Sequence, residues 1–187
     1  GGVTGREFLT AVALGVDVAS SIGISSRSPI AHFRPGTTGA FGAVDAAGKI
    51  AGFVQATLSN AMGIVYSQIC GTLQPHSECA QVNSMQTGFN ARAAVTAISL
   101  AARGIQGASE VLEGRYGYFR LFEGEYDVEE ALANLGNVWQ VERISHKPFP
   151  CGRLTHGAIE AALTLKERHR FNADDVDEFE ALVPPLV

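Results

Sequence analysis

Apolar and small residues recur at helical spacing over most of the first half of this chain. The clearest stretch runs from Thr4 to Ile24, where Thr4 followed by Glu7 has the spacing of a capping box. Phe53 to Gly71 and Phe89 to Arg103 repeat apolar residues at helical intervals. Many of these positions hold Ala, Gly or Ser, which let helices approach closely. The pattern predicts a mainly α fold whose first domain is an all-α helical bundle.

The segments between these helices carry turn signals. Ser25 to Thr38 predicts a loop that leads into a helix from Ala40 to about Ile50. Leu73 to Gly88 predicts a second loop, and Asp127 is a suitable N-cap for a short helix ending near Leu135. The first loop ends in Thr and Gly at a helix start, where free backbone amides are available to an anion.

The composition is that of a folded chain with few charges. Of its 187 residues, 46% are apolar and 18% are charged, and the formal net charge is −5. The sequence has no basic run, so we expect neither nucleic acid nor an anionic membrane as a partner. No uninterrupted apolar run approaches the roughly 20 residues of a membrane span, and the sequence has no cleavable signal pattern.

The three cysteines, Cys70, Cys79 and Cys151, are odd in number and widely spaced. This spacing disfavours a disulfide framework and an iron–sulfur cluster, and it favours free thiols in a reducing compartment. His76 and Cys79 are three residues apart, but two ligands without a second pair are a weak metal signal. We therefore expect no metal site.

The segment Lys147-Pro148-Phe149-Pro150-Cys151-Gly152-Arg153-Leu154-Thr155-His156 concentrates cationic, imidazole and thiol groups. Its two prolines predict a rigid turn between a strand at Trp139–Ser145 and a helix at Arg153–His169. Arg153 and His156 would share one face of that helix, with Lys147 supplied by the turn. The residue types leave two interpretations open: a pocket for a small anion at the helix start, or a surface loop with solvated charges.

The turn also separates two predicted domains. Residues 1–144 form the helical part, and residues 145–187 begin a smaller α+β domain, in which Phe171 to Val183 predicts an acidic turn followed by a strand. The acidic residues there are typical of a solvated helix start rather than of a metal site. Ligand clefts favour domain boundaries, so we expect the cleft between these two parts.

The segment from Lys147 to His156, with Ala158-Ile159-Glu160-Ala161 after it, resembles the K-P-Y-P-C-C-R-x-T-H-x-A-I-D-A segment of the MmgE/PrpD family. Phe149 stands in place of the family's Tyr, and Gly152 in place of its second Cys. The resemblance continues in other stretches, such as Gly63 to Gln68, which is similar to the family's G-I-A-G-S-Q. Family members are much longer, so we expect this chain to be a central piece.

The resemblance implies a lyase-type enzyme, whether dehydratase, decarboxylase or isomerase. It would act on a small di- or tricarboxylic acid by proton abstraction next to a carboxylate, without a metal or organic cofactor. It further implies a homodimer in the cytoplasm. Lys147 and His156 are the expected catalytic residues, with Lys147 as first choice. The expected substrate-binding residues are Arg34, Ser67, Gln68, Asn83, Gln86 and Arg153.

Three of these positions depart from the family pattern. Arg34 aligns with a family His, so it keeps a donor for a carboxylate but loses a proton shuttle. Asn83 and Gln86 replace a Lys and a His with neutral amides that cannot exchange protons efficiently. The alternative function is therefore a truncated or degenerate member that binds a carboxylate, or only assembles, without catalysis.

Ser67, Gln68 and His32 can also be explained without a role in substrate binding. Ser67 and Gln68 are equally suited to hydrogen-bonding neighbouring helix ends as to binding substrate oxygens. His32, two residues before Arg34, is expected to be a solvent-exposed loop histidine.

Overall fold

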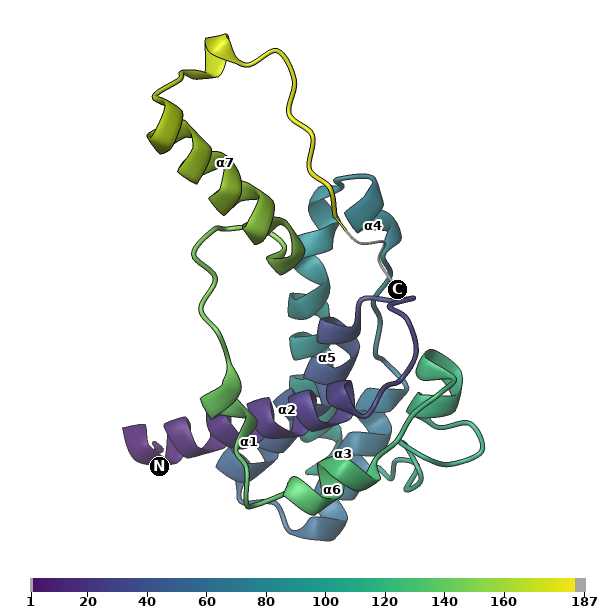
Figure 1. The fold of residues 1–187 in the computed structure, drawn as a ribbon. Coiled ribbons are helices and arrows are strands. Elements are labelled where there is room, and N and C mark those ends of the chain that lie inside the picture. The colour runs from purple at the N-terminus through teal and green to yellow at the C-terminus, as the bar shows by residue number, and fades with distance from the viewer. Residues whose placement is uncertain (1, 184–187) are drawn as a thin grey trace. The chain divides into compact units, whose positions relative to one another are not determined.

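The computed structural model describes residues 2–183, and the chain divides into two compact units, residues 1–143 and 144–187 (Figure 1). The division lies one residue from the expected boundary after residue 144. Throughout the described range the regular elements are helices, and the one β-type pairing is an isolated antiparallel bridge between Ser26 and Tyr126. The predicted mainly α class is confirmed.

Helix α1 (Gly5–Ile24) begins at the predicted capping box. The Thr4 hydroxyl accepts from the backbone N–H of Glu7 at 3.3 Å, and the Glu7 carboxylate accepts from the Thr4 N–H at 2.7 Å. The helix packs against α2 (Arg34–Ala51) where two glycines face each other. A Cβ on Gly15 would lie 2.6 Å from the carbonyl oxygen of Gly42, so the contact requires glycine.

Among the described helices, α1 alone is long and apolar enough to cross a membrane, with a mean hydropathy of 1.5. A core helix of a protein that does not cross a membrane can also meet this criterion. In this structure α1 carries the buried Asp17, whose carboxylate accepts from the backbone N–H of Gln140 at 2.8 Å. That bond satisfies the first N–H of the 3₁₀ helix η3 (Gln140–Arg143). The prediction of a strand at Trp139–Ser145 is therefore wrong.

Helix α2 begins at Arg34, earlier than the predicted start at Ala40. Pro35 is tolerated because the first helical turn needs no N–H donor from it. The hydroxyls of Thr37 and Thr38 donate to the Arg34 carbonyl at 3.1 and 3.0 Å, which stabilises the turn. The helix ends at Gly52 in a left-handed conformation with φ of +69°.

The predicted helix from Phe53 is observed as α3 (Gln55–Tyr66), so Ser67 and Gln68 lie just beyond its end. The predicted loop before Gly88 is occupied by two short elements, α4 (Gln74–Ser77) and η1 (Gln81–Met85). The third predicted helix is present as α5 (Gln86–Ala101).

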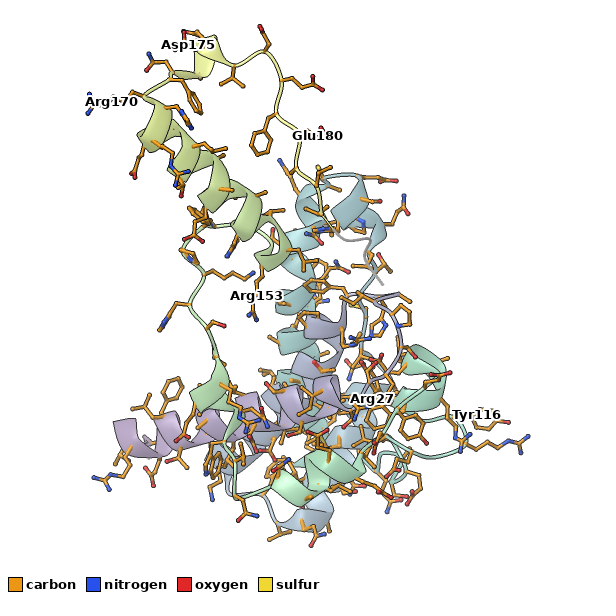
Figure 2. The ribbon with its side chains drawn as sticks, viewed as in Figure 1. Arg27, Tyr116, Arg153, Arg170, Asp175 and Glu180 are labelled. Carbon is orange, nitrogen blue, oxygen red and sulfur yellow. The ribbon has the colours of Figure 1, made fainter. Side chains whose placement is uncertain are left out.

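After α5 the chain makes several tight turns, and Tyr116 projects to solvent from one of them (Figure 2). A single π-helical turn, η2 (Phe119–Glu123), follows and was not predicted. Helix α6 (Glu129–Asn134) is shorter than predicted, and its N-cap is Val128 rather than the expected Asp127, although the Asp127 carboxylate accepts from the Glu129 N–H at 3.0 Å.

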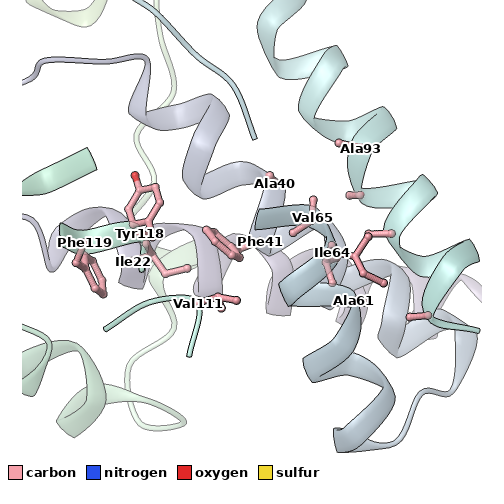
Figure 3. Close-up of a cluster of buried hydrophobic side chains, with 14 residues drawn as sticks. Ile22, Ala40, Phe41, Ala61, Ile64, Val65, Ala93, Val111, Tyr118 and Phe119 are labelled. Atoms are coloured by element: carbon pink, nitrogen blue, oxygen red, sulfur yellow. The ribbon is translucent and has the colours of Figure 1, made fainter. Parts of the chain in front are cut away.

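The core of the first unit is a cluster of aromatic and small aliphatic side chains (Figure 3). Phe41 of α2 and Tyr118 are fully buried and meet edge to face, with ring centroids 5.7 Å apart. Helix α5 contributes alanines to this core: Ala93, Ala94, Ala97 and Ala101. Their small size lets α5 lie close to α2, as the composition indicated.

The second unit contains η4 (Arg153–Thr155), α7 (His156–His169) and η5 (Ala173–Asp175). The predicted helix at 153–169 is confirmed. The predicted strand after Val176 is wrong within the described residues, where 176–183 form no ladder. A strand needs a neighbouring strand for its N–H and C=O groups. That this unit begins an α+β domain stays a prediction.

Candidate functional site

Residues 147–156, here called the proline corner, fold into a compact turn before α7. The Lys147 ammonium donates to the Cys151 carbonyl at 3.2 Å, and the Cys151 N–H donates to the Phe149 carbonyl at 2.8 Å. The Cys151 thiol lies 3.1 Å from the Thr155 hydroxyl. The cationic side chain of Lys147 is thereby tied back to the residues that precede the helix.

The two cations of the proline corner, Lys147 and Arg153, are exposed. All four ion pairs found in residues 2–183 lie elsewhere, so neither cation has a carboxylate partner there. Arg153 extends away from the axis of α7 (Figure 2). Within its own unit the corner therefore presents uncompensated positive charge on a surface and does not enclose it.

His156, the first residue of α7, is partly buried. Its ring packs edge-on against Phe149, with centroids 5.4 Å apart and an interplanar angle of 82°. Its Nε2 atom is buried and has no hydrogen-bond partner in the described part of the chain. A buried nitrogen without a partner costs free energy, which marks His156 as the unsatisfied group of the corner.

Arg34 is engaged by Glu123. Its Nε and Nη2 atoms donate to the two Glu123 carboxylate oxygens at 3.0 and 2.8 Å, and Nη2 also donates to the Ser28 carbonyl at 3.2 Å. Burial alone raises the pKa of Glu123, but hydrogen bonds from Arg34, Ser26 and Tyr118 hold it below its usual value. The guanidinium that was expected to clamp a substrate carboxylate thus already binds a protein carboxylate.

Tyr118 and His32 complete this buried polar cluster. The Tyr118 hydroxyl donates to Glu123 at 2.9 Å and lies 3.2 Å from His32 Nε2. Burial raises the pKa of Tyr118. His32 is only 8% exposed, so the expectation of a solvent-exposed histidine is wrong. The His32 ring is buried because it packs against the rings of Phe122 and Tyr118.

Ser67 and Gln68 are hydrogen-bonded to the last turn of α3. The Ser67 hydroxyl donates to the Gly63 carbonyl at 3.4 Å, and the Gln68 amide donates to the Ile64 carbonyl at 3.1 Å. This matches the alternative in which these side chains satisfy a helix end. Gln68 retains a second N–H and a carbonyl oxygen for other contacts.

Gln86 holds the loop before α5. Its side-chain carbonyl accepts from the Thr72 N–H at 2.7 Å, and its amide donates to the Thr72 carbonyl at 3.1 Å and to the Asn83 side chain at 3.3 Å. The structure thus brings Asn83 and Gln86 together, but in a partly buried set of hydrogen bonds that joins two loop segments. Their assignment to substrate binding stays a prediction.

The described residues contain no evident set of ligands for a metal ion. No group of three His, Cys, Asp or Glu side chains comes close enough to hold an ion there. The buried polar cluster contains one histidine and one carboxylate, His32 and Glu123, which already contact each other at 3.5 Å.

Comparison with known proteins adds a family assignment to this geometry. The model of the MmgE/PrpD N-terminal domain matches residues 1–131. Two curated Aspergillus terreus sequences named cis-aconitate decarboxylase, one from strain NIH 2624 / FGSC A1156, are each 34% identical over 131 residues. The match covers 66% of this chain and 26% of each relative. The proline corner lies beyond the residues that the family model matches.

Proposed function

This chain belongs to the MmgE/PrpD family, and on that premise we propose that its protein is a lyase acting on a small di- or tricarboxylic acid. The relatives' printed name, cis-aconitate decarboxylase, supports a reaction at a carbon next to a carboxylate. The chain spans about a quarter of the length of these relatives, so the proposal concerns the complete protein.

The proposed chemistry is proton transfer at the carbon next to a carboxylate. Such a step needs a base or acid at that carbon and a donor that stabilises the enolate-like charge. In the proposal Lys147 exchanges the proton, His156 assists it, and Arg153 binds a substrate carboxylate. These three side chains belong to one ten-residue turn, so no long-range contact is needed to assemble them.

The observation that carries this proposal is the free charge of Lys147. Its ammonium contacts only the Cys151 carbonyl at 3.2 Å among the described residues, and no carboxylate neutralises it. An ion pair at an exposed position contributes little, so the ammonium stays available to an anionic substrate at little cost in stability. The unsatisfied Nε2 of His156 nearby in the same turn supports a site that is completed by a ligand.

The test uses Lys147→Met in the complete protein. The matched control is Lys166→Met, a lysine of α7 in the same unit. Turnover is followed by loss of the alkene absorbance of cis-aconitate and by release of carbon dioxide. We expect Lys147→Met to lose about a hundredfold to ten-thousandfold in kcat, the range that a proton-transferring group contributes. Full activity in Lys147→Met, or an equal loss in Lys166→Met, would remove Lys147 from the mechanism.

A second candidate function is carboxylate binding without turnover. Two contacts favour it: Arg34 is paired with Glu123, and Gln86 is hydrogen-bonded to Thr72. The family has a titratable histidine at the positions of Arg34 and Gln86, whereas in this chain both side chains are already bound within the protein. Calorimetric titration of the complete protein with citrate and cis-aconitate, beside the turnover assay, separates the two. Saturable binding with no product formed supports this second function.

We extend the proposal to assembly and cofactor use. The complete protein would be a cytoplasmic homodimer that needs no metal ion or organic cofactor. Sedimentation equilibrium tests the dimer, and turnover after exhaustive dialysis against a chelator tests metal use. A monomer, or activity that returns only when a divalent ion is added, contradicts the corresponding part.

A further inference from the structure

A small cavity of about 220 Å³ opens in the first unit beside the middle of α5. Its walls come from α5 and from the segment that follows α3, and they consist of Gln68, Cys70, Phe89, Arg92, Ala93 and Thr96. The one formal charge among these residues is that of Arg92. The cavity is therefore a recess with a single positive charge at its mouth.

The charge on Arg92 is not compensated within the described residues. Helix α5 contains no Asp or Glu, and Arg92 takes part in none of the ion pairs found there. Its guanidinium lies over the Phe89 ring, 5.7 Å from the centroid. The cation–π contact restrains the guanidinium beside the recess while leaving its N–H groups available.

The opposite wall is held rigidly by a buried amide. Asn90, 2% exposed, accepts from the Cys70 N–H at 3.1 Å and donates to the Cys70 carbonyl at 2.7 Å. The same amide donates to the Gln86 carbonyl oxygen at 2.8 Å. Because these bonds clamp Cys70 to α5, the recess exists before any ligand enters.

The remaining polar groups match one small anionic ligand. Gln68 uses one amide N–H on Ile64 and keeps a second N–H and its oxygen. The Thr96 hydroxyl donates to the Arg92 carbonyl at 3.0 Å, so it offers only lone pairs. Phe89 and Ala93 supply an apolar wall for a short hydrocarbon tail. A strong cationic donor, an amide and a small apolar wall together fit a carboxylate with a few carbons.

We propose that this cavity binds a small monocarboxylate, with the carboxylate on Arg92 and Gln68 and the tail against Phe89 and Ala93. The cavity is below the roughly 300 Å³ at which sites for drug-sized ligands begin, which limits the ligand to a few heavy atoms. The site lies within one unit and includes neither Lys147 nor His156. It shares Gln68 with the predicted substrate-binding residues, so Arg92, which is outside that set, is the residue that separates this site from the proposed lyase activity.

The experiment titrates the complete protein with propionate and, in parallel, with propionamide, its neutral isostere. Binding is followed by chemical-shift changes of the Gln68 side-chain amide. We expect saturation by propionate at millimolar concentration and none by propionamide. Arg92→Gln should weaken propionate binding about tenfold or more, because it removes the charged donor. Arg103→Gln, at an exposed position just beyond the end of the same helix, should leave binding unchanged.

Three results would overturn the site. They are equal binding of propionate and propionamide, an Arg92→Gln variant that binds like the wild type, and an equal loss in Arg103→Gln, which would indicate a general surface potential. Thermal unfolding of Arg92→Gln keeps the test interpretable: if the variant is destabilised, Arg92→Lys, which retains the charge without the planar fork, should restore part of the binding.

Discussion

The guanidinium of Arg34 and the carboxylate of Glu123 form a two-point ion pair, with bonds of 3.0 and 2.8 Å, across 89 residues of sequence. The pair joins the first turn of α2 to the end of η2. The Glu123 side chain is 1% exposed, and that of Arg34 is 19% exposed. A pair this deeply placed becomes an uncompensated buried charge as soon as one partner is removed.

Replacement of Glu123 by Gln tests this role. The variant leaves Arg34 without its counter-charge, and we expect the free energy of unfolding to fall by about 3 kcal/mol, as for other broken buried pairs. Chemical denaturation measures the change. Glu125→Gln, at the exposed position two residues later, should stay within about 0.5 kcal/mol of the wild type. Equal stability of Glu123→Gln and Glu125→Gln would contradict a stabilising pair.

The same cluster sets a pH dependence of stability. Burial lowers the pKa of His32 below its ordinary 6.5, outweighing the attraction of Glu123, and the charge of Arg34 acts in the same direction as burial. The pKa of Glu123 also lies below its ordinary 4.5. In both cases the unfolded chain binds more protons, so stability is lost as the pH falls, first below 6.5 through His32 and then below 4.5 through Glu123.

His32→Gln isolates the first of these steps. The variant cannot take up a proton there, so its free energy of unfolding should fall less steeply than that of the wild type between about pH 7 and pH 5. Denaturant unfolding at several pH values in this range gives the two slopes. His146→Gln, an exposed histidine, serves as control and should keep the wild-type slope. If His32→Gln also keeps that slope, His32 is not the group that titrates.

The helices could be predicted because their signals are local. Thr4 and Glu7 are three residues apart, and the alanines of α5 repeat within one helix. The buried polar cluster could not, because Arg34 and Glu123 are far apart in sequence and a single Glu in a turn-rich segment carries no pattern. The same cause explains the wrong strand at Trp139–Ser145, since the capping Asp17 lies 123 residues before Gln140.

The candidate site, too, could be predicted only in part. The turn at Lys147 to His156 follows from two prolines and a helix start, and the structure contains it. What the sequence could not reveal is which polar side chains are already occupied by the protein. Arg34 and Gln86 have the right chemistry for a substrate, but Glu123 and Thr72 take up their donors and acceptors. Such occupancy depends on tertiary contacts alone.

The packing of α1 on α2 gives a prediction about the fold. A Cβ on Gly42 would meet the backbone oxygen of Gly15, which cannot move without shifting a whole helix. We expect Gly42→Ala to lower the free energy of unfolding by about 2 kcal/mol or more. Gly39→Ala, in the same helix with open space around the new methyl group, should be neutral or stabilise by about 0.5–1 kcal/mol. A melting experiment in which the two variants behave alike would contradict the glycine contact.

Gln86 offers the sharpest separation between a structural and a substrate-binding role. Replacing it with Ala removes two hydrogen bonds to the backbone of Thr72, which is exposed and can bond to water instead, so we expect about 1 kcal/mol of destabilisation. If the side chain serves only this loop, Gln86→Ala should bind citrate with wild-type affinity at a temperature where it is folded. Gln106→Ala, at an exposed position, is the control for stability. An affinity loss of tenfold or more without destabilisation would instead assign Gln86 to the substrate, as its alignment with a family histidine implies.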